Sequence, residues 1–241
     1  MQLFYQADIQ KETKTFTFDK VESKHIVRVL RKKVGDLLQI TNGKQLLFTA
    51  EIINADEKKC AVRVIEITEK KSVRNFNLSI AIAPTKSNER FEWFLEKATE
   101  IGIDEIYPII CKHSERKVIK PERLQKVLIT AMKQSLQNKL PVLHKTLSFK
   151  EFMAIEKQGD TFIAYCESDK DKSSRNDLKT SVKTGRDTCI LIGPEGDFSP
   201  DEISLALQNK FIPVSLGATR LRTETAGIVA VHTVNLLNDN L

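Results

Sequence analysis

The sequence has no apolar run long enough to cross a membrane. No stretch approaches the roughly 20 apolar residues that a spanning helix needs. Residues 1 to 5 have neither the basic nor the apolar region of a signal peptide. We therefore expect a protein that stays in the cytoplasm. With 241 residues and 41% hydrophobic content, the chain can form one large domain or two modest ones with a real core.

Cysteine and histidine are scarce, with four of each in the chain. The cysteines lack the paired spacing of zinc sites and disulfide frameworks, so we expect reduced core residues at Cys60, Cys111, Cys166 and Cys189. The histidines are equally isolated, with no second histidine three or four residues away from His25, His113, His144 or His232. The sequence therefore predicts no metal site.

The excess of positive charge is modest and uneven. A formal net charge of +6 and a pI near 9.0 fit a polyanionic partner, although many globular proteins are as basic. Residues 1 to 72 hold 14 Lys+Arg and 10 Asp+Glu, a net charge of +4, which leaves +2 for the remaining residues. The smaller N-terminal part is thus the more basic one.

The N-terminal part has the pattern of a small β domain. Alternating or apolar runs at residues 15 to 18, 37 to 41, 46 to 53 and 60 to 67, with an Asn-Gly turn at 42 and 43, predict short antiparallel strands. Between them, residues 23 to 33 have a helical pattern. Four cations lie on and after its exposed side, namely Arg28, Arg31, Lys32 and Lys33. Charge alone does not distinguish a solvated helix end from a phosphate-binding surface.

Residues 69 to 75 carry no apolar pattern and are the predicted linker, after which strands alternate with helices. We expect strands at 76 to 83, 106 to 111 and 162 to 166, and helices at 88 to 101 and 121 to 137, with Gly102 as a natural stop. This alternation predicts an α/β domain with a mainly parallel sheet.

Two strand, glycine turn and helix units follow each other near the C-terminus. In the first, residues 189 to 192 are a buried strand, Gly193 and Gly196 lie in the turn, and Ser199 can cap a helix with Glu202 three residues later. Pro200 suits the first helical position. Ligands of open α/β sheets bind beyond the carboxyl ends of strands, although the same pattern also fits a plain connection.

The second unit repeats this order. Residues 211 to 216 are a strand candidate, Gly217 opens the turn, and Thr223 is a candidate N-cap. The helix that follows, to residue 237, is so densely apolar that we expect it to be covered nearly all round, by the rest of the chain or by a partner.

These motifs resemble those of the SPOUT superfamily of S-adenosylmethionine-dependent RNA methyltransferases, and within it the 16S ribosomal RNA uracil-N3 methyltransferase family. The resemblance rests on LIGPEGDFSPDEI and LGATRLRTETA near the C-terminus, on HIVRVLRKKVGD in the N-terminal part and on FEWFLEKATEIGIDEIYPI in the centre. Several motifs in one order are far more specific than a single one, and these cover both halves of the chain.

The resemblance implies a fold and partners. It implies a PUA-like, RNA-binding β-barrel over residues 1 to 70. Over residues 75 to 241 it implies a SPOUT domain, an α/β domain whose mainly parallel sheet has helices on both faces and whose C-terminal segment forms a trefoil knot. The expected partners are small-subunit ribosomal RNA, within an assembled or assembling subunit, and a second copy of the chain bound through the C-terminal domain. For the basic residues near Arg28, the resemblance also favours RNA binding over a solvated helix end.

The expected cofactor is S-adenosylmethionine, which the SPOUT loops would hold largely through backbone groups. A phosphate loop would have a lysine beside its glycines, whereas this turn presents Glu195, a carboxylate suited to ribose hydroxyls, an amine or a sulfonium. The positions that match the cofactor loops, or that we expect to line the pocket beside them, are Tyr165, Ile192, Gly193, Glu195, Gly196, Leu216, Gly217, Leu221, Thr223 and Ala226.

Methylation of uracil N3 requires loss of a proton and stabilisation of the charge on the two carbonyl oxygens. Arg222 is the residue that we expect to face those oxygens. Arg220 is a second RNA-facing candidate, and Glu224 or Glu195 could take the proton. Structural roles remain open for these residues: Arg222 could bind a phosphate or pair with Glu224, and Glu224 could favour a helix N-terminus.

The sequence departs from the family pattern at three places. Asp197 stands where a glycine is usual, Lys133 replaces a glutamate, and residues 136 to 139 lack an arginine. Asp tolerates a positive φ better than most residues, if position 197 needs one. The predicted function is methylation of uridine N3 in 16S ribosomal RNA. The alternatives are another SPOUT enzyme, acting on a ribose or on transfer RNA, and a non-catalytic RNA-binding assembly factor.

Overall fold

The computed structural model describes residues 2–69, 74–166 and 176–239, so most of the predicted linker lies outside the described residues. The chain divides into two compact units. The first comprises Met1–Ser72 and Met132–Leu140, and the second comprises Val73–Ala131 and Pro141–Leu241. Met132–Leu140 thus groups with the first unit although both neighbouring segments belong to the second.

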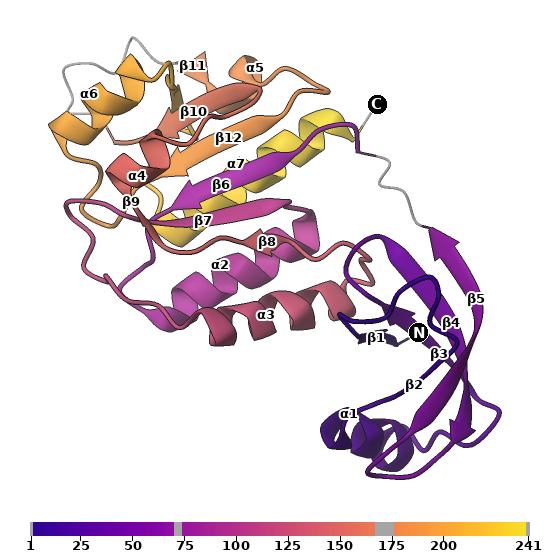
Figure 1. Ribbon diagram of the computed structural model, residues 1–241. Coiled ribbons are helices and arrows are strands. Elements are labelled where there is room, and N and C mark those ends of the chain that lie inside the picture. Colours follow the sequence, from indigo (N-terminus) through magenta and orange to yellow (C-terminus); the bar gives the residue numbers. More distant parts are fainter. Residues whose placement is uncertain (1, 70–73, 167–175, 240–241) are drawn as a thin grey trace. The chain divides into compact units, whose positions relative to one another are not determined.

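The first unit is a curled five-stranded sheet (Figure 1). Its strands are β1 (Leu3–Tyr5), β2 (Thr15–Thr17), β3 (Leu37–Thr41), β4 (Leu46–Asn54) and β5 (Ala61–Glu69), in the order β1-β3-β4-β5-β2. The fold is the predicted PUA-like one, but the sheet is a half-barrel, and β1 pairs with β3 in parallel. The parallel pair arises because the chain crosses through β2 and a helix before it returns as β3.

The helical segment of this unit differs from its prediction. Asp19 accepts hydrogen bonds from the amides of Val21 and Glu22 and so starts α1 (Lys20–Lys24), which continues as a π-helix, η1 (His25–Val29). The helix ends before residue 33 because Arg31 has a φ of 55°. Arg31, Lys32 and Lys33 therefore lie beyond the helix, whereas the predicted helical pattern ran to residue 33.

The Asn-Gly turn after β3 holds the segment Met132–Leu140. The amide of Leu140 donates to the carbonyl of Gly43 at 2.9 Å, and the amide of Gln45 donates to that of Asn138 at 2.8 Å. A Cβ atom on Gly43 would lie 2.9 Å from the Leu140 Cβ, so the close approach requires glycine. Lys133, one of the departures from the family pattern, forms an ion pair of 2.7 Å with Glu22.

The second unit is built on a parallel sheet of eight strands among the described residues. Seven run in the order β11-β13-β10-β12-β6-β7-β8, and β9 pairs with β7. The strands are β6 (Leu78–Ile82), β7 (Glu105–Ile110), β8 (Val142–Leu143), β9 (Leu147–Ser148), β10 (Asp160–Ala164), β11 (Asn176–Asp177), β12 (Thr188–Ile192) and β13 (Ile212–Ser215). The predicted α/β class with a mainly parallel sheet is confirmed.

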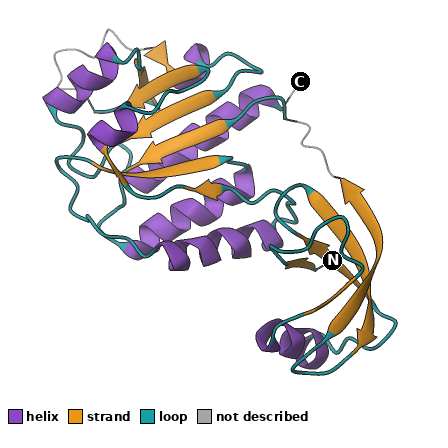
Figure 2. Ribbon diagram, in the orientation of Figure 1, coloured by secondary structure: helices purple, strands orange, loops and turns teal. Residues whose placement is uncertain are grey.

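Helices cover both faces of this sheet (Figure 2). The helices are α2 (Asn88–Ile101), α3 (Pro121–Gln134), α4 (Phe149–Met153), α5 (Leu178–Ser181), α6 (Pro200–Gln208) and α7 (Thr223–Asn238). One buried cluster joins Ala81, Cys189 and Leu191 of the strands to α4 and α6. Neighbouring side chains such as Ile82 point to the other face. There α7 packs on α2 so closely that a Cβ on Gly227 would lie 2.6 Å from the Phe94 ring.

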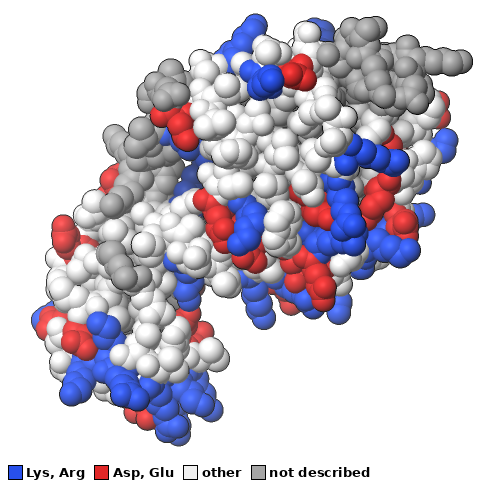
Figure 3. Space-filling model, turned by 180° about the vertical axis from the view of Figure 1, so that it is seen from behind, with Lys and Arg blue, Asp and Glu red and all other residues white. Residues whose placement is uncertain are grey.

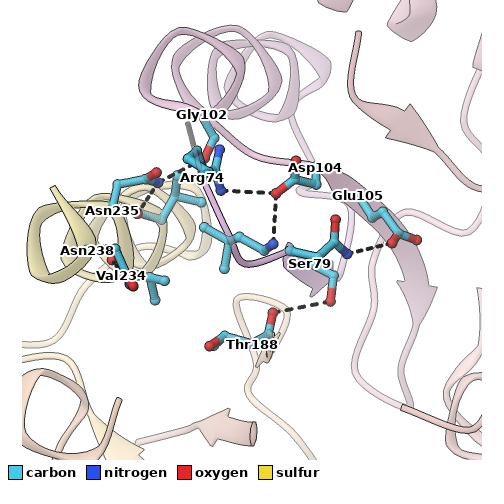
Figure 4. Close-up of polar contacts among 12 residues, drawn as sticks. Arg74, Ser79, Gly102, Asp104, Glu105, Thr188, Val234, Asn235 and Asn238 are labelled. Carbon is cyan, nitrogen blue, oxygen red and sulfur yellow. Dashed lines mark hydrogen bonds and ion pairs between the residues drawn. The ribbon is translucent and has the colours of Figure 1, made fainter. Parts of the chain in front are cut away.

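The amino ends of the central strands are joined to one another by polar contacts (Figure 4). Asp104, which is 4% exposed, accepts hydrogen bonds from the Arg74 guanidinium and the Leu78 amide. Asn235 of α7 donates to the carbonyl of Gly102, which ends α2. The described carboxyl edge, by contrast, carries the glycine bends. In the described ranges, no helix combines the length and the apolar character that a membrane span requires.

Candidate functional site

The first glycine bend follows β12 and leads into α6, as the sequence predicts. Ser199 accepts a hydrogen bond from the amide of Glu202, and the Glu202 carboxylate accepts from the amide of Ser199, which completes the predicted capping box. Pro200 is the first residue of the helix. The bend itself, residues 193 to 199, therefore lies beyond the carboxyl end of a central strand (Figure 1).

The second bend joins β13 to α7. The structure corrects the predicted cap, because Arg222 occupies the N-cap position and Thr223 is the first helical residue. The Thr223 hydroxyl donates instead to the carbonyl of Gly193, at 3.0 Å. Two bends separated by some 20 residues of sequence are thus joined by a buried hydrogen bond.

The two bends enclose a hollow of about 840 Å³. It lies within the range of about 300–1,000 Å³ that is common for small-molecule sites. All but one of the residues predicted to bind the cofactor line it, namely Tyr165, Ile192, Gly193, Glu195, Leu216, Gly217, Leu221, Thr223 and Ala226. The exception is Gly196, whose carbonyl lies 3.0 Å from Nδ1 of His113. Gly217 has a φ of 135°, and a Cβ there would meet nothing within 4 Å.

Glu195 lines the hollow, and one of its two carboxylate oxygens has no hydrogen-bond partner among the described residues. Its Oε1 accepts a hydrogen bond of 2.9 Å from the backbone amide of Lys86, in the turn after β6. Its Oε2 is buried and has no partner among the described residues. An unpartnered buried acceptor is unfavourable by about 1–3 kcal/mol. Since Glu195 also lines the hollow, its carboxylate contributes negative charge there.

The two arginines of the second bend both line the hollow, and both are exposed. Glu224 does not line it. This residue is only 6% exposed, and its Oε1 lies 3.8 Å from Nε of Arg90, on α2. The structure therefore places Arg220 and Arg222 at the hollow and directs Glu224 toward another helix.

Asp197 has a left-handed backbone conformation, with a φ of 62°, which a glycine adopts without strain. Its carboxylate accepts hydrogen bonds from the amide of Cys166 at 2.6 Å and from the amide of Phe198 at 2.8 Å. The side chain thus connects the first bend to the end of β10. The expected tolerance of aspartate for a positive φ accounts for this substitution.

Several residues of the hollow were not predicted from the sequence, including Asp177 and Cys166. Cys166 follows the end of β10, so the rule that ligands bind beyond strand carboxyl ends could have found it. The expectation that it is a core residue is wrong, since it is exposed, while Cys60, Cys111 and Cys189 are buried. Nothing in the sequence around Asp177 distinguishes it. Within the described ranges, no three His, Cys, Asp or Glu side chains form a group suited to a metal ion.

The basic residues of the first unit lie around the end of the π-helix. Arg31 and Lys33 are exposed and Lys32 is half-buried. Arg28 forms an ion pair of 2.5 Å with Glu57, and this contact raises the pKa of Arg28 and lowers the pKa of Glu57. Figure 3 shows lysine and arginine side chains gathered over the end of the unit that carries α1. Part of that charge is thus compensated locally.

Comparison with known proteins identifies relatives along nearly the whole chain. Residues 72–235 match the family model described as the RNA methyltransferase domain, and residues 18–65 match that of the RNA methyltransferase PUA domain. Ribosomal RNA small subunit methyltransferase E of Rickettsia conorii is 31% identical over 90% of this chain and 87% of its own.

Two solved structures resemble this one closely. The probable rRNA-methyltransferase of Porphyromonas gingivalis is 42% identical, with a TM-score of 0.91 over 100% of this chain and 99% of the other. A protein of Legionella pneumophila, solved in complex with the bound cofactor SAM, is 27% identical, with a TM-score of 0.84 over 98% and 97% of the two chains.

Proposed function

Because this chain belongs to the ribosomal RNA small subunit methyltransferase E family, we propose that it transfers the methyl group of S-adenosylmethionine to N3 of a uridine in 16S ribosomal RNA. The observation that carries this proposal is the hollow between the two bends, held together by the Thr223 to Gly193 hydrogen bond.

The hollow suits the cofactor in size and in chemistry. Backbone groups of the two bends, at Gly193, Leu216, Gly217 and Leu221, would hold the adenosyl part. Glu195 lines the hollow and brings a negative charge that suits an amine or a sulfonium. When bound, S-adenosylmethionine supplies an activated methyl group. The Legionella pneumophila relative, whose structure holds this cofactor, supports the assignment.

Arg222 is the catalytic residue that we propose. Its guanidinium would face the two carbonyl oxygens that flank N3 and stabilise the negative charge that spreads onto them. That charge stabilisation also lowers the affinity of N3 for its proton. We assign no proton transfer to Glu224, since its carboxylate is buried and faces Arg90. The new bond joins N3 to the methyl carbon, the sulfur–carbon bond breaks, and the N3 proton leaves to solvent.

The two domains would divide the work. We place the RNA-binding domain at residues 1–70, where the PUA match lies, and the methyltransferase domain at residues 75–241. Arg31, Lys32 and Lys33 would contact RNA phosphates, with Arg28 contributing less because Glu57 shares its charge. Arg220 would contact RNA beside the hollow. With a substrate in the small ribosomal subunit, the enzyme would act in the cytoplasm.

A second copy of the chain would cover the free side of α7. His232 is exposed and Leu236 is 56% exposed, and residues 228 and 229 on the same side are only half-buried. The described residues of one chain therefore do not cover this helix all round. We propose a homodimer through the methyltransferase domain, which sedimentation equilibrium would show as twice 27.4 kDa.

The function is tested by identifying the methylated nucleoside. Purified protein, S-adenosylmethionine and small ribosomal subunits from a strain that lacks the gene are incubated, and the RNA is digested for mass spectrometry. We expect 3-methyluridine in the small-subunit RNA. A 2′-O-methylated nucleoside, or product only with transfer RNA, would identify a different SPOUT enzyme. Cofactor binding without any product would favour a non-catalytic assembly factor.

A further inference from the structure

The turn after β6 connects the cofactor hollow to a more distant loop. Its residue Thr85 is fully buried, and the amide of Lys86 holds Oε1 of Glu195 at 2.9 Å. The position of the Glu195 carboxylate therefore depends on where this turn lies. Lys86 is exposed, so this end of the turn needs contacts that fix it before its amide can orient a side chain of the hollow.

Arg116 supplies those contacts. Its guanidinium Nε donates to the carbonyls of Thr85 at 3.0 Å and Lys86 at 3.1 Å, and its Nη2 also donates to the Lys86 carbonyl. Charged donors form stronger hydrogen bonds than neutral ones, and the planar guanidinium can bind two neighbouring acceptors at once. Arg116 is half-buried and comes from the loop after β7.

The same loop, residues 112–116, also holds the first glycine bend. Nδ1 of His113 lies 3.0 Å from the Gly196 carbonyl and 3.1 Å from the Asp197 carbonyl. The amide of Lys112 donates to the Glu202 carboxylate at 2.8 Å. We call residues 112–116 the brace loop, because it contacts both segments that meet at Glu195.

We infer that Arg116 is a positioning residue for the cofactor hollow. It fixes the Thr85–Lys86 turn, whose amide orients Glu195 toward the ligand. This inference rests on the proposed function, since it takes S-adenosylmethionine as the ligand. Arg116 itself does not line the hollow, so it acts through Glu195 and contributes no group to the transfer step.

The expected change in cofactor affinity follows from the hydrogen bond between the Lys86 amide and Glu195, which Arg116 keeps in place. A hydrogen bond to a charged group contributes about 1.5–3 kcal/mol, or roughly 10- to 100-fold in affinity. Since the Arg116→Ala change loosens the turn without removing the Lys86 amide, we expect the lower end, about tenfold weaker cofactor binding. The KM for S-adenosylmethionine should rise by a similar factor, while kcat at saturating cofactor changes less than twofold.

The test is calorimetric titration of the full chain with S-adenosylmethionine, for Arg116→Ala, Glu195→Gln and the double variant. If Arg116 acts through Glu195, the Arg116→Ala change weakens binding less than twofold further in the Glu195→Gln background. Arg116→Lys, which keeps a charged donor, should bind with intermediate affinity. The matched control is Arg123→Ala, an arginine that pairs with Glu92 and should leave affinity unchanged.

Two results would overturn the inference. One is an unchanged affinity of Arg116→Ala while the wild-type protein binds normally. The other is a full additional loss in the double variant, which would show that Arg116 acts independently of Glu195. If Arg116→Ala is too unstable to titrate, the comparison of Arg116→Lys with the wild type decides by the same criteria. A wild-type protein that binds no S-adenosylmethionine would instead remove the proposed function, and this inference with it.

Discussion

Arg222 lies at the start of α7 with extended backbone, at a φ of −71° and a ψ of 156°. The residue thus stands outside the helix, and it lines the hollow. Thr223, the next residue, also lines the hollow, and its hydroxyl anchors the bend to Gly193. Two adjacent residues therefore have different roles: Arg222 presents its side chain to the hollow, and the Thr223 hydroxyl holds the loop.

Replacement of Arg222 by alanine should separate catalysis from cofactor binding. We expect kcat to fall about 100- to 1,000-fold, the usual effect of removing one group that stabilises a developing charge. The affinity for S-adenosylmethionine should stay within a few-fold, because backbone groups hold the adenosyl part. Single-turnover methylation and calorimetry measure the two quantities. A variant with full activity would show that Arg222 has no catalytic role.

Elements were predictable where a local signal agrees with the tertiary packing. The helix at residues 88 to 101 has its predicted bounds, because its apolar stripe and Gly102, with a φ of 116°, mark the same end. The capped helix after Ser199 was equally clear. The three-residue strand Leu3–Tyr5 was not, because it has no period or turn signal of its own, and the helical pattern of residues 23 to 33 did not indicate that His25–Val29 is a π-helix. Their form depends on packing against the rest of the first unit.

Strand β7 starts with a carboxylate that holds its neighbours together. Glu105 accepts hydrogen bonds of 2.7 Å from the side chains of Asn77, Tyr107 and His144, and the rings of Tyr107 and His144 stack at 3.8 Å. Burial opposes ionisation of this carboxyl, but the three hydrogen bonds together outweigh it and lower the pKa of Glu105 below its ordinary value of 4.5. The contacts thus join β7 to the residues before β6 and after β8.

The lowered pKa of Glu105 predicts how its contribution to stability depends on pH. A carboxyl with a lower pKa in the folded state stabilises the fold above its unfolded pKa, and that stabilisation is lost as pH falls through the folded pKa. At pH 7 we expect the Glu105→Gln change to lower the free energy of unfolding by about 1 kcal/mol. This figure is reduced because Glu105 is partly exposed. Denaturant unfolding from pH 7 to pH 3 should show this difference shrinking below 4.5. Glu122→Gln, on the exposed side of α3, is the control, and a difference that is constant with pH would contradict the prediction.

At the scale of the whole chain, the site was predictable as a pair of motifs but not as a geometry. The residues of both bends were identifiable because each follows a segment that the sequence predicts to be a strand, namely β12 and β13. Which of their side chains face the hollow was not, because that depends on contacts between distant segments. Glu224 was expected beside the substrate and instead faces Arg90, and Arg116 lies in a loop with no motif. The trefoil knot that the resemblance implies stays a prediction.

The distribution of charge over the molecule predicts how RNA binding responds to salt. Since each neutralised phosphate releases bound counterions, the slope of log affinity against log salt should fall by about 0.7–0.9 for each phosphate that a variant leaves unneutralised. Reversal to glutamate at Arg31 and Lys33, which are exposed, should weaken binding and flatten this slope. Arg28→Glu should have a smaller effect, because Arg28 already shares its charge with Glu57.

The measurement is a filter-binding titration with small-subunit RNA at several salt concentrations, with Arg63→Glu as the control. Arg63 is a comparably exposed arginine of the same unit that pairs with Glu51 on β4. Cofactor binding should be unchanged in all of these variants, because none of the substituted residues lines the hollow. If the slopes of the Arg31 and Lys33 variants equal that of the control, this cluster is a solvated surface, and the RNA contacts of the N-terminal unit lie elsewhere.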